Sequence, residues 1–311
     1  MITYILNMAT SFALFFYGIT SINKILCNVN KERIKKMIIN KKSNILSIIK
    51  GIIVTIIVQS SSFVTVLLTN LVDAGIISLK DASNIIMGSN IGTCFTGFFI
   101  ALFLNNNLDF NINTIIGIFS IISFIYNYLH HKNKANFIIG IIIILFSINL
   151  MSSSSSLLDA KHLDFIFRHI DNPFIGIIIG ILLTFIFQSS SLITGLLCSM
   201  SITFNISYLG AINLILGSNI GTCSTALISS ITLSKNAKKV GIYHLCFNII
   251  GSLIFLSGIL IINYIYGTNF IYRYVNTYDI ALINISFNVL STILIFPFNN
   301  KMLKLCHFLV K

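Results

Sequence analysis

The sequence predicts an all-α integral membrane protein, and its composition, its apolar stretches and an internal duplication all favour this class. Hydrophobic residues make up 56% of the 311 residues, whereas charged residues make up only 9%. A water-soluble domain of this size could not cover so much apolar surface with so few polar groups. The surrounding solvent is therefore predicted to be mostly lipid.

Five apolar stretches have the length of a transmembrane helix, roughly 15 to 26 residues against the ~20 that cross a hydrocarbon core. They lie near residues 3–23, 112–129, 137–151, 240–265 and 280–297. The first has no Lys or Arg before Lys24 and no small-residue cleavage site. It is therefore expected to remain as a span rather than to be removed as a signal peptide.

The formal net charge of +12 raises the alternative of a nucleic-acid-binding protein. The basic residues, however, lie in short segments between apolar stretches, without the interleaved aromatic residues that would stack on bases. This arrangement is typical of the positive-inside rule of membrane proteins, so no nucleic acid partner is expected. The six Cys residues include no close pair of the kind that marks a zinc site, and free thiols are expected.

Two sequence motifs each occur twice in the chain. The second copy of each follows the first at the same distance, which is the distance from Gln59 to Gln188. Gln59–Ser62 (Gln-Ser-Ser-Ser) recurs as Gln188–Ser191, and Gly88–Cys94 (Gly-Ser-Asn-Ile-Gly-Thr-Cys) recurs as Gly217–Cys223. Other identical pairs at this offset are Gly51/Gly180, Thr55/Thr184, Thr65/Thr194, Ala82/Ala211 and Asn84/Asn213. The sequence therefore predicts an internal duplication. Residues 1–129 form transmembrane repeat 1, residues 130–258 form repeat 2, and residues 259–311 hold the rest of the penultimate span, the final span and a short cytoplasmic tail.

The charges that flank the motifs predict opposite orientations for the two repeats. Seven basic residues between Lys24 and Lys42 precede the first Gln-Ser-Ser-Ser, whereas the segment 159–171 before the second is mixed in charge. After the Gly-Ser-Asn motifs the pattern reverses, since 105–109 has no basic residue and 235–239 has three. The positive-inside rule then predicts inverted repeats, with the N-terminus outside and the C-terminus cytoplasmic.

Each repeat must cross the bilayer once between its flanking segments, yet each contains two apolar segments separated by a polar turn. Segments 51–72 and 180–201, with Gln-Ser-Ser-Ser near their centres, are predicted to be re-entrant hairpins, because arms of about ten residues reach about 15 Å. Segments 82–104 and 208–233 are predicted to cross fully as helices broken at their Gly-Ser-Asn-Ile-Gly-Thr motifs, where glycines permit unwinding. The total is about seven full spans and two hairpins.

The duplicated motifs have the residue types of an ion-binding site near the membrane midplane. Helix N-termini attract an anion and freed carbonyls attract a cation, while Ser hydroxyls and Gln or Asn amides serve both. The alternative is that these polar residues only join transmembrane helices. All eight acidic residues fall in predicted loops or turns, so a proton relay through the core is not expected. A sodium ion would offset the charge of a bound anion.

The spacing of the two motifs resembles that of the sodium/phosphate cotransporter family, since Gly88 follows Gln59 at the same interval at which Gly217 follows Gln188. That family includes bacterial members and animal type II transporters, and the resemblance extends from about residue 10 to Asn300. It implies a plasma-membrane symporter of inorganic phosphate and Na⁺ that works by alternating access around a site between the motif pairs. The implied binding residues are Gln59, Ser60, Ser61, Ser62, Thr65, Asn90, Thr93, Gln188, Ser189, Ser190, Ser191, Thr194, Asn219 and Thr222.

Three features depart from the family pattern. Cys94 and Cys223 stand where a second Thr often follows Gly-Thr, and Asn284 stands where relatives often carry His. The chain also stops soon after the last predicted span, whereas many bacterial relatives continue into a PhoU-like domain. Regulation of that kind would have to come from a separate PhoU-like protein or be absent.

His244 and Asn284 share a spacing, since each precedes a Phe-Asn pair by three residues. We interpret both as helix-packing or interfacial contacts and leave them outside the predicted site.

Other functions are weighed against transport. An enzyme is not expected, because the sequence has no His-Glu-x-x-His, no Gly-x-Ser-x-Gly and no carboxylate pair in a predicted span. A phosphate-sensing or scaffolding membrane protein would need the same binding residues, and the same donors would serve another small oxyanion such as arsenate. No cofactor is expected beyond Na⁺ as the coupling ion.

Overall fold

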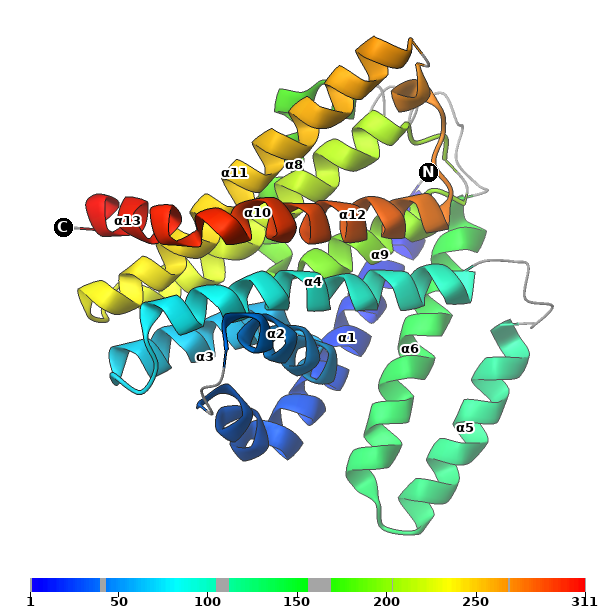
Figure 1. The fold of residues 1–311 in the computed structure, drawn as a ribbon. Helices are drawn as coiled ribbons and strands as arrows, with labels where there is room; N and C mark the ends of the chain where they lie inside the picture. Colours follow the sequence, from blue (N-terminus) through cyan, green and yellow to red (C-terminus); the bar gives the residue numbers. More distant parts are fainter. Residues whose placement is uncertain are drawn as a thin grey trace.

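The computed structural model describes residues 2–39, 43–104, 112–155, 169–202, 204–267 and 269–310, and within these ranges it contains helices and no β-strand (Figure 1). The helices are α1 (Ile2–Ile39), α2 (Asn44–Val58), α3 (Ser61–Asp73), α4 (Leu79–Leu104), α5 (Ile112–Tyr128), α6 (Lys132–Ser155), α8 (Pro173–Phe187), α9 (Ser190–Met200), α10 (Tyr208–Ser230), α11 (Lys235–Tyr266), α12 (Thr277–Ile295) and α13 (Asn299–Leu309). Two of the predicted external segments, 105–109 and most of 159–171, lie outside the described residues.

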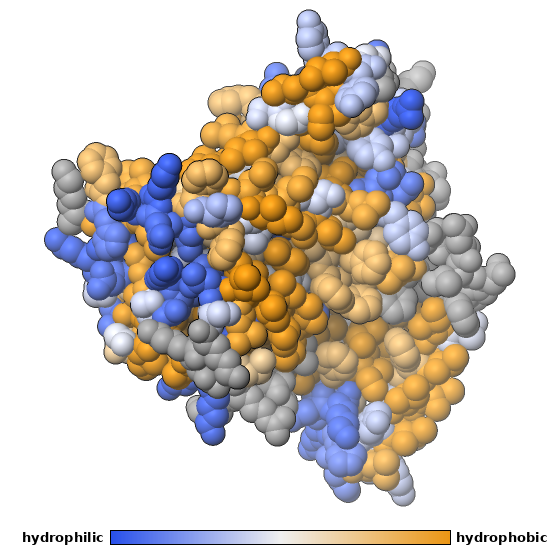
Figure 2. All heavy atoms as spheres, in the orientation of Figure 1, coloured by the Kyte–Doolittle hydropathy of each residue, from blue (hydrophilic) through white to orange (hydrophobic). Residues whose placement is uncertain are grey.

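Helix length and composition mark the chain as a membrane protein. Four helical stretches of the described chain are long and apolar enough to cross a bilayer, and the bent pair α8–α9 gives a fifth candidate if it counts as one span. The four are Leu79–Leu102, Tyr208–Ser230, Lys235–Tyr266 and Thr277–Leu309. Figure 2 shows apolar side chains across the middle of the visible face, with hydrophilic groups gathered toward its edges. The class is confirmed, whereas the count of seven spans stays a prediction.

Both Gln-Ser-Ser-Ser motifs lie at a sharp turn between two helices. α2 ends at Val58 and α3 begins at Ser61, and in the same way α8 is followed by α9 after a bend of 119°. The first residue of each motif, Gln59 or Gln188, adopts the left-handed conformation, with φ of 57° and 52°. Residues other than glycine seldom adopt this conformation. Its presence at both positions shows that the two copies make the same backbone turn.

The predicted helix breaks at Gly88–Thr93 and Gly217–Thr222 are wrong, because α4 and α10 continue through them. The glycines serve close packing instead. A Cβ atom added to Gly88 would lie 1.9 Å from the Ile48 carbonyl oxygen of α2, and one added to Gly217 would lie 2.1 Å from the Ile177 carbonyl oxygen of α8. Missing side chains let two helix backbones touch, as small residues often do between membrane helices.

The predicted basic loop after the first span is also helical over most of its length, since α1 continues to Ile39. Ile34 and Ile38 are 1% and 4% exposed and join a hydrophobic cluster that includes residues of α2, α3 and α4. Burial of these two side chains explains why the segment is ordered as a helix despite its many lysines.

Local contacts repeat with the duplication. α2 packs on α4 as α8 packs on α10, and the second arm of each hairpin packs on the central helix of the other copy, α3 on α10 and α9 on α4. The Thr55 hydroxyl donates to Ser89 Oγ over 2.7 Å, and its counterpart Thr184 donates to Ser218 Oγ over 2.8 Å. α11 and α12 complete the arrangement, with α11 against α10 and α3, and α12 against α4 and α9.

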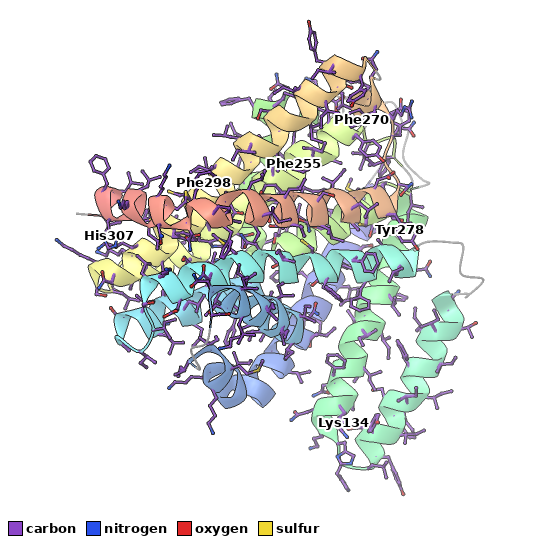
Figure 3. All side chains as sticks on the ribbon, in the orientation of Figure 1. Lys134, Phe255, Phe270, Tyr278, Phe298 and His307 are labelled. Atoms are coloured by element: carbon purple, nitrogen blue, oxygen red, sulfur yellow. The ribbon has the colours of Figure 1, made fainter. Side chains whose placement is uncertain are left out.

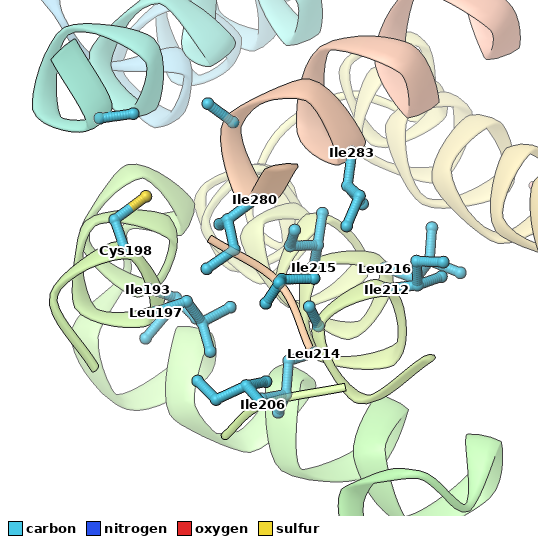
Figure 4. Close-up of a cluster of buried hydrophobic side chains, with 14 of the residues drawn as sticks. Ile193, Leu197, Cys198, Ile206, Ile212, Leu214, Ile215, Leu216, Ile280 and Ile283 are labelled. Carbon is cyan, nitrogen blue, oxygen red and sulfur yellow. The ribbon is translucent and has the colours of Figure 1, made fainter. Parts of the chain in front are cut away.

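The two central helices, α4 and α10, run in opposite directions (Figure 1). Among the described residues, buried hydrophobic side chains form two clusters, one of which is drawn in Figure 4 with residues such as Ile193, Ile212 and Ile280 from α9, α10 and α12. α5 and α6 pack on each other beside this body, and Figure 3 places Lys134, near the start of α6, at the far turn of that arm.

Candidate functional site

The two hairpin tips meet at one pocket of about 250 Å³. The pocket-lining residues are Phe16 and Thr20 of α1, Gln59, Ser60, Ser61 and Ser62 of the first tip, and Phe187, Gln188, Ser189, Ser190 and Ser191 of the second. Every residue of the two Gln-Ser-Ser-Ser motifs therefore lies at this pocket, although the two motifs are far apart in the sequence.

Serine side chains organise each tip in the same way. Ser60 caps α3 by accepting a hydrogen bond from the Phe63 N–H over 3.2 Å, and Ser189 caps α9 by accepting one from the Leu192 N–H over 3.3 Å. A capping Oγ that accepts in this way keeps its own O–H for another partner. The tips also touch directly, since the Ser62 hydroxyl lies 3.4 Å from the Gln188 carbonyl oxygen that accepts its proton.

The pocket presents donors without a charged side chain. None of its lining residues is Asp, Glu, Lys, Arg or His. The first turns of α3 and α9 begin at its wall, and the N–H groups of a first turn have no partner within the helix. Two helix N-termini and several hydroxyls around one cavity form an environment that favours an anion.

Three further residues at or beside the pocket were missed from the sequence. Phe16 of α1 contacts Phe187, with ring centroids 6.2 Å apart, and Thr20 lies one turn further along α1. Thr96 of α4 donates its hydroxyl proton to Gln59 Oε1 over 2.6 Å. Thr96 had a signal, because Thr225 stands at the equivalent position of the second copy, but nothing in the sequence singled out Phe16 or Thr20.

The predicted contacts of the Gly-Ser-Asn motifs do not line this pocket. Thr93 and Thr222 each donate to the carbonyl oxygen four residues earlier in their own helix, over 3.0 Å in both cases. Thr65 and Thr194, one turn beyond the tips, likewise donate to Ser61 O and Ser190 O. All four hydroxyls are buried.

Asn90 and Asn219 instead reach α11 and α12. Asn90 Oδ1 lies 3.1 Å from His244 Nε2, and Asn219 Nδ2 donates to Asn284 Oδ1 over 3.4 Å. The partners His244 and Asn284 are the two residues of the shared Phe-Asn spacing that the predicted site left out. Their repeated spacing was the available signal, and the contacts make them neighbours of predicted binding residues.

The thiols of the central helices complete a crossed pattern. Asn248 of α11 donates to Cys223 Sγ over 3.1 Å, and Asn288 of α12 donates to Cys94 Sγ over 3.2 Å. α4 therefore contacts α11 through its Asn and α12 through its Cys, and α10 does the reverse. Within the described residues no group of three or more His, Cys, Asp or Glu side chains is placed to hold a metal ion.

Fold and pocket together define a helical membrane protein with a duplicated, uncharged, donor-rich site between two hairpins. The chain belongs to the Na⁺/Pi-cotransporter family, whose model matches residues 14–153 and, in a second match, residues 143–267. The family is named for the cotransport of Na⁺ and inorganic phosphate, and the resemblance seen in the sequence is confirmed.

The individual relatives that align with nearly the whole chain have low sequence identity to it. The uncharacterized protein YqeW of Bacillus subtilis is 28% identical over 98% of both chains. YjbB of Escherichia coli strain K12, named for inorganic phosphate export, is 22% identical over 99% of this chain, which spans only 56% of YjbB. Sodium-dependent phosphate transport protein 2A of rabbit is 46% identical over 55 residues, or 18% of this chain and 9% of its own length. No solved structure matches.

Proposed function

We propose that the chain is a secondary transporter that carries inorganic phosphate across the plasma membrane together with Na⁺. The observation that supports this proposal best is the single pocket lined by both Gln-Ser-Ser-Ser motifs. Hydroxyls and helix N-termini supply donors for the phosphate oxygens at this place. In this proposal the eight motif residues at the pocket bind the substrate. Six further residues that do not line the pocket contribute to binding of phosphate or Na⁺: Thr65, Thr194, Asn90, Thr93, Asn219 and Thr222.

Charge balance supports sodium coupling. Phosphate carries one or two negative charges near neutral pH, and moving such an ion into a site without a cationic side chain is costly. Sodium bound at the same time offsets that cost, and the oxygens of Ser, Thr and Gln side chains with nearby carbonyls are the ligands that a hard cation prefers. One electrostatic requirement would then couple the two fluxes.

Alternating access between inverted repeats is the mechanism that we propose for this site. Support comes from the opposite directions of α4 and α10, and from the hairpin arms that pack on the other copy's central helix. The helix–turn–helix segments at Gln59 and Gln188 would enter the bilayer from opposite faces and return. The repeat boundaries, the full span count, the outside N-terminus and cytoplasmic C-terminus, and a separate PhoU-like regulator belong to the same proposal.

Phosphate export without sodium is a second candidate, because YjbB, named for export, aligns with nearly the whole of this chain. Neither candidate is an enzyme, in keeping with a family of transporters.

A binding measurement tests the proposal. The melting temperature of the purified protein in detergent should rise on addition of phosphate only when Na⁺ is present, because the anion and cation bind together. Choline chloride replaces sodium chloride in the control, and sulfate and arsenate replace phosphate to define the oxyanion. Equal stabilisation by phosphate in sodium and in choline would contradict sodium coupling and favour the export candidate. No stabilisation by any oxyanion would contradict the site.

A further inference from the structure

Two residues, His244 of α11 and Asn284 of α12, occupy equivalent places in the two halves of the molecule. Each stands three residues before a Phe-Asn pair, and each contacts the motif asparagine of one central helix, Asn90 or Asn219. Both are buried, at 0% and 3% exposure. They differ in chemistry, because an amide has an acceptor oxygen and an NH2 group with two donors at its end, whereas a neutral imidazole has one N–H donor and one acceptor nitrogen at different places on its ring.

Asn284 uses both ends of its amide to join three elements. Its Oδ1 accepts from Asn219 of α10, and its Nδ2 donates to Thr194 Oγ1 of α9 over 3.5 Å. Thr194 in turn donates to Ser190 O over 3.1 Å, and Ser190 lines the pocket. A chain of hydrogen bonds therefore runs from α10 through α12 to the tip of the second hairpin.

The corresponding chain stops at His244 in the other half. Asn90 Oδ1 can only accept, so the Nε2 that faces it carries the ring proton. The other nitrogen, Nδ1, is buried and has no hydrogen-bond partner within the described residues. Thr65, the counterpart of Thr194, donates to its own helix, at Ser61 O and Ser62 O. In the part of the chain that the structure describes, the first hairpin therefore lacks the hydrogen bond to α11 that would match the bond between Asn284 and Thr194.

We propose that Asn284 is a positioning residue that holds the second hairpin tip for substrate through Thr194. His244 gives the first hairpin no matching bond, and the first tip is held instead by the 2.6 Å hydrogen bond from Thr96 of α4 to Gln59 Oε1. This inference rests on the proposed function, because a tip matters only if its serines bind the ion. A tip that is held in place needs no ordering when substrate arrives, so its contribution to affinity is greater.

Substitution of Asn284 tests this role. Asn284→His removes the amide that accepts from Asn219 and leaves Thr194 Oγ1 without its donor. Asn299→His is the matched control, because Asn299 is a buried asparagine that donates to Ser83 and Asn84, outside the pocket lining.

Hydrogen–deuterium exchange of the purified protein reads tip mobility without any transport. Asn284→His should speed exchange in peptides over the second tip about 3- to 10-fold, the effect of losing one hydrogen bond, and leave the first tip unchanged. Equal changes at both tips, or changes no larger than those of Asn299→His, would overturn the proposal.

Kinetics supply the second readout. Asn284→His should raise the KM for phosphate about 3- to 10-fold with turnover per folded molecule retained, whereas Asn299→His should leave the KM unchanged. A purely structural role would lower the folded fraction and leave KM alone. If the unmodified protein carries no phosphate, the proposed function fails, while the exchange comparison still decides whether Asn284 holds the hairpin.

Discussion

The Asp73 carboxylate accepts a hydrogen bond from the Ser234 backbone N–H over 2.8 Å. Asp73 ends α3, a few residues before α4 begins, and Ser234 follows the end of α10. The start of one central helix therefore lies beside the end of the other. Two packed copies of one sequence pattern that run in opposite directions would make such a contact.

This contact predicts that the turn after α3 and the turn after α10 face the same side of the membrane. Single cysteines introduced at Ile76 and Lys235 should both react with an impermeant thiol reagent from the cytoplasmic side, because 235–239 is rich in lysine. Cysteines within 105–109 and 159–171 should react from outside. Labelling of the Ile76 and Lys235 positions from opposite sides would contradict the inverted arrangement.

Glycine at the crossing of α2 and α4 should be required for folding. Gly88→Ala places a methyl group 1.9 Å from the Ile48 carbonyl oxygen, so the helices must separate, at a cost of about 1 to 3 kcal/mol or more. The melting temperature in detergent and the yield of monodisperse protein should both fall. Gly117→Ala is the control, since an added Cβ there meets nothing within 4 Å, and a similar loss in both variants would contradict the packing explanation.

The duplicated hydroxyl pairs should contribute equally to stability. Thr55→Val and Thr184→Val each keep the side-chain shape but leave a buried serine, Ser89 or Ser218, without its donor. Each should lower the free energy of unfolding by about 1 to 3 kcal/mol. Thermal or denaturant unfolding measures the effect, with Thr10→Val, at an exposed site, as control. A loss in only one of the pair would show that the two halves are not equivalent at this contact.

The serine hydroxyls at the two hairpin tips should contribute to the affinity for phosphate or sodium, which thermal stabilisation by ligand measures. Ser61→Ala or Ser190→Ala removes a donor from the shared pocket and should weaken phosphate or sodium affinity roughly 5- to 150-fold, equivalent to about 1 to 3 kcal/mol. Ser257→Ala, whose exposed hydroxyl bonds its own helix, should leave affinity unchanged. If both tip variants bind as the control does, the motif is structural.

The turns at Gln59 and Gln188 could be predicted from the sequence, because a polar quartet in the middle of an apolar segment must leave the lipid. The continuity of α4 and α10 through their Gly-Ser-Asn motifs could not be predicted, since a glycine permits both an unwound helix and a close helix crossing. Only the position of Ile48 beside Gly88 decides between them. The local sequence pattern thus predicts where the chain turns, whereas tertiary packing determines whether a glycine breaks a helix or lets two helices pack closely.

The site was partly visible in the same way. Duplication selected the eight tip residues, and the structure places all of them at one pocket. His244 contacts Asn90 across 154 positions of sequence, and Asn284 contacts Asn219 across 65. No spacing rule reveals such partners, because the pairing arises only when α11 and α12 pack against the central helices.

Flux of radiolabelled phosphate into proteoliposomes measures sodium-coupled phosphate transport itself. Purified protein is reconstituted, and uptake is followed with an inward sodium gradient, with a proton gradient alone, and with no gradient. We expect phosphate accumulation driven by sodium, loss of accumulation when choline replaces sodium, and no uptake driven by protons alone. Accumulation driven by a proton gradient without sodium, or no phosphate flux under any gradient, would contradict sodium-coupled transport of phosphate.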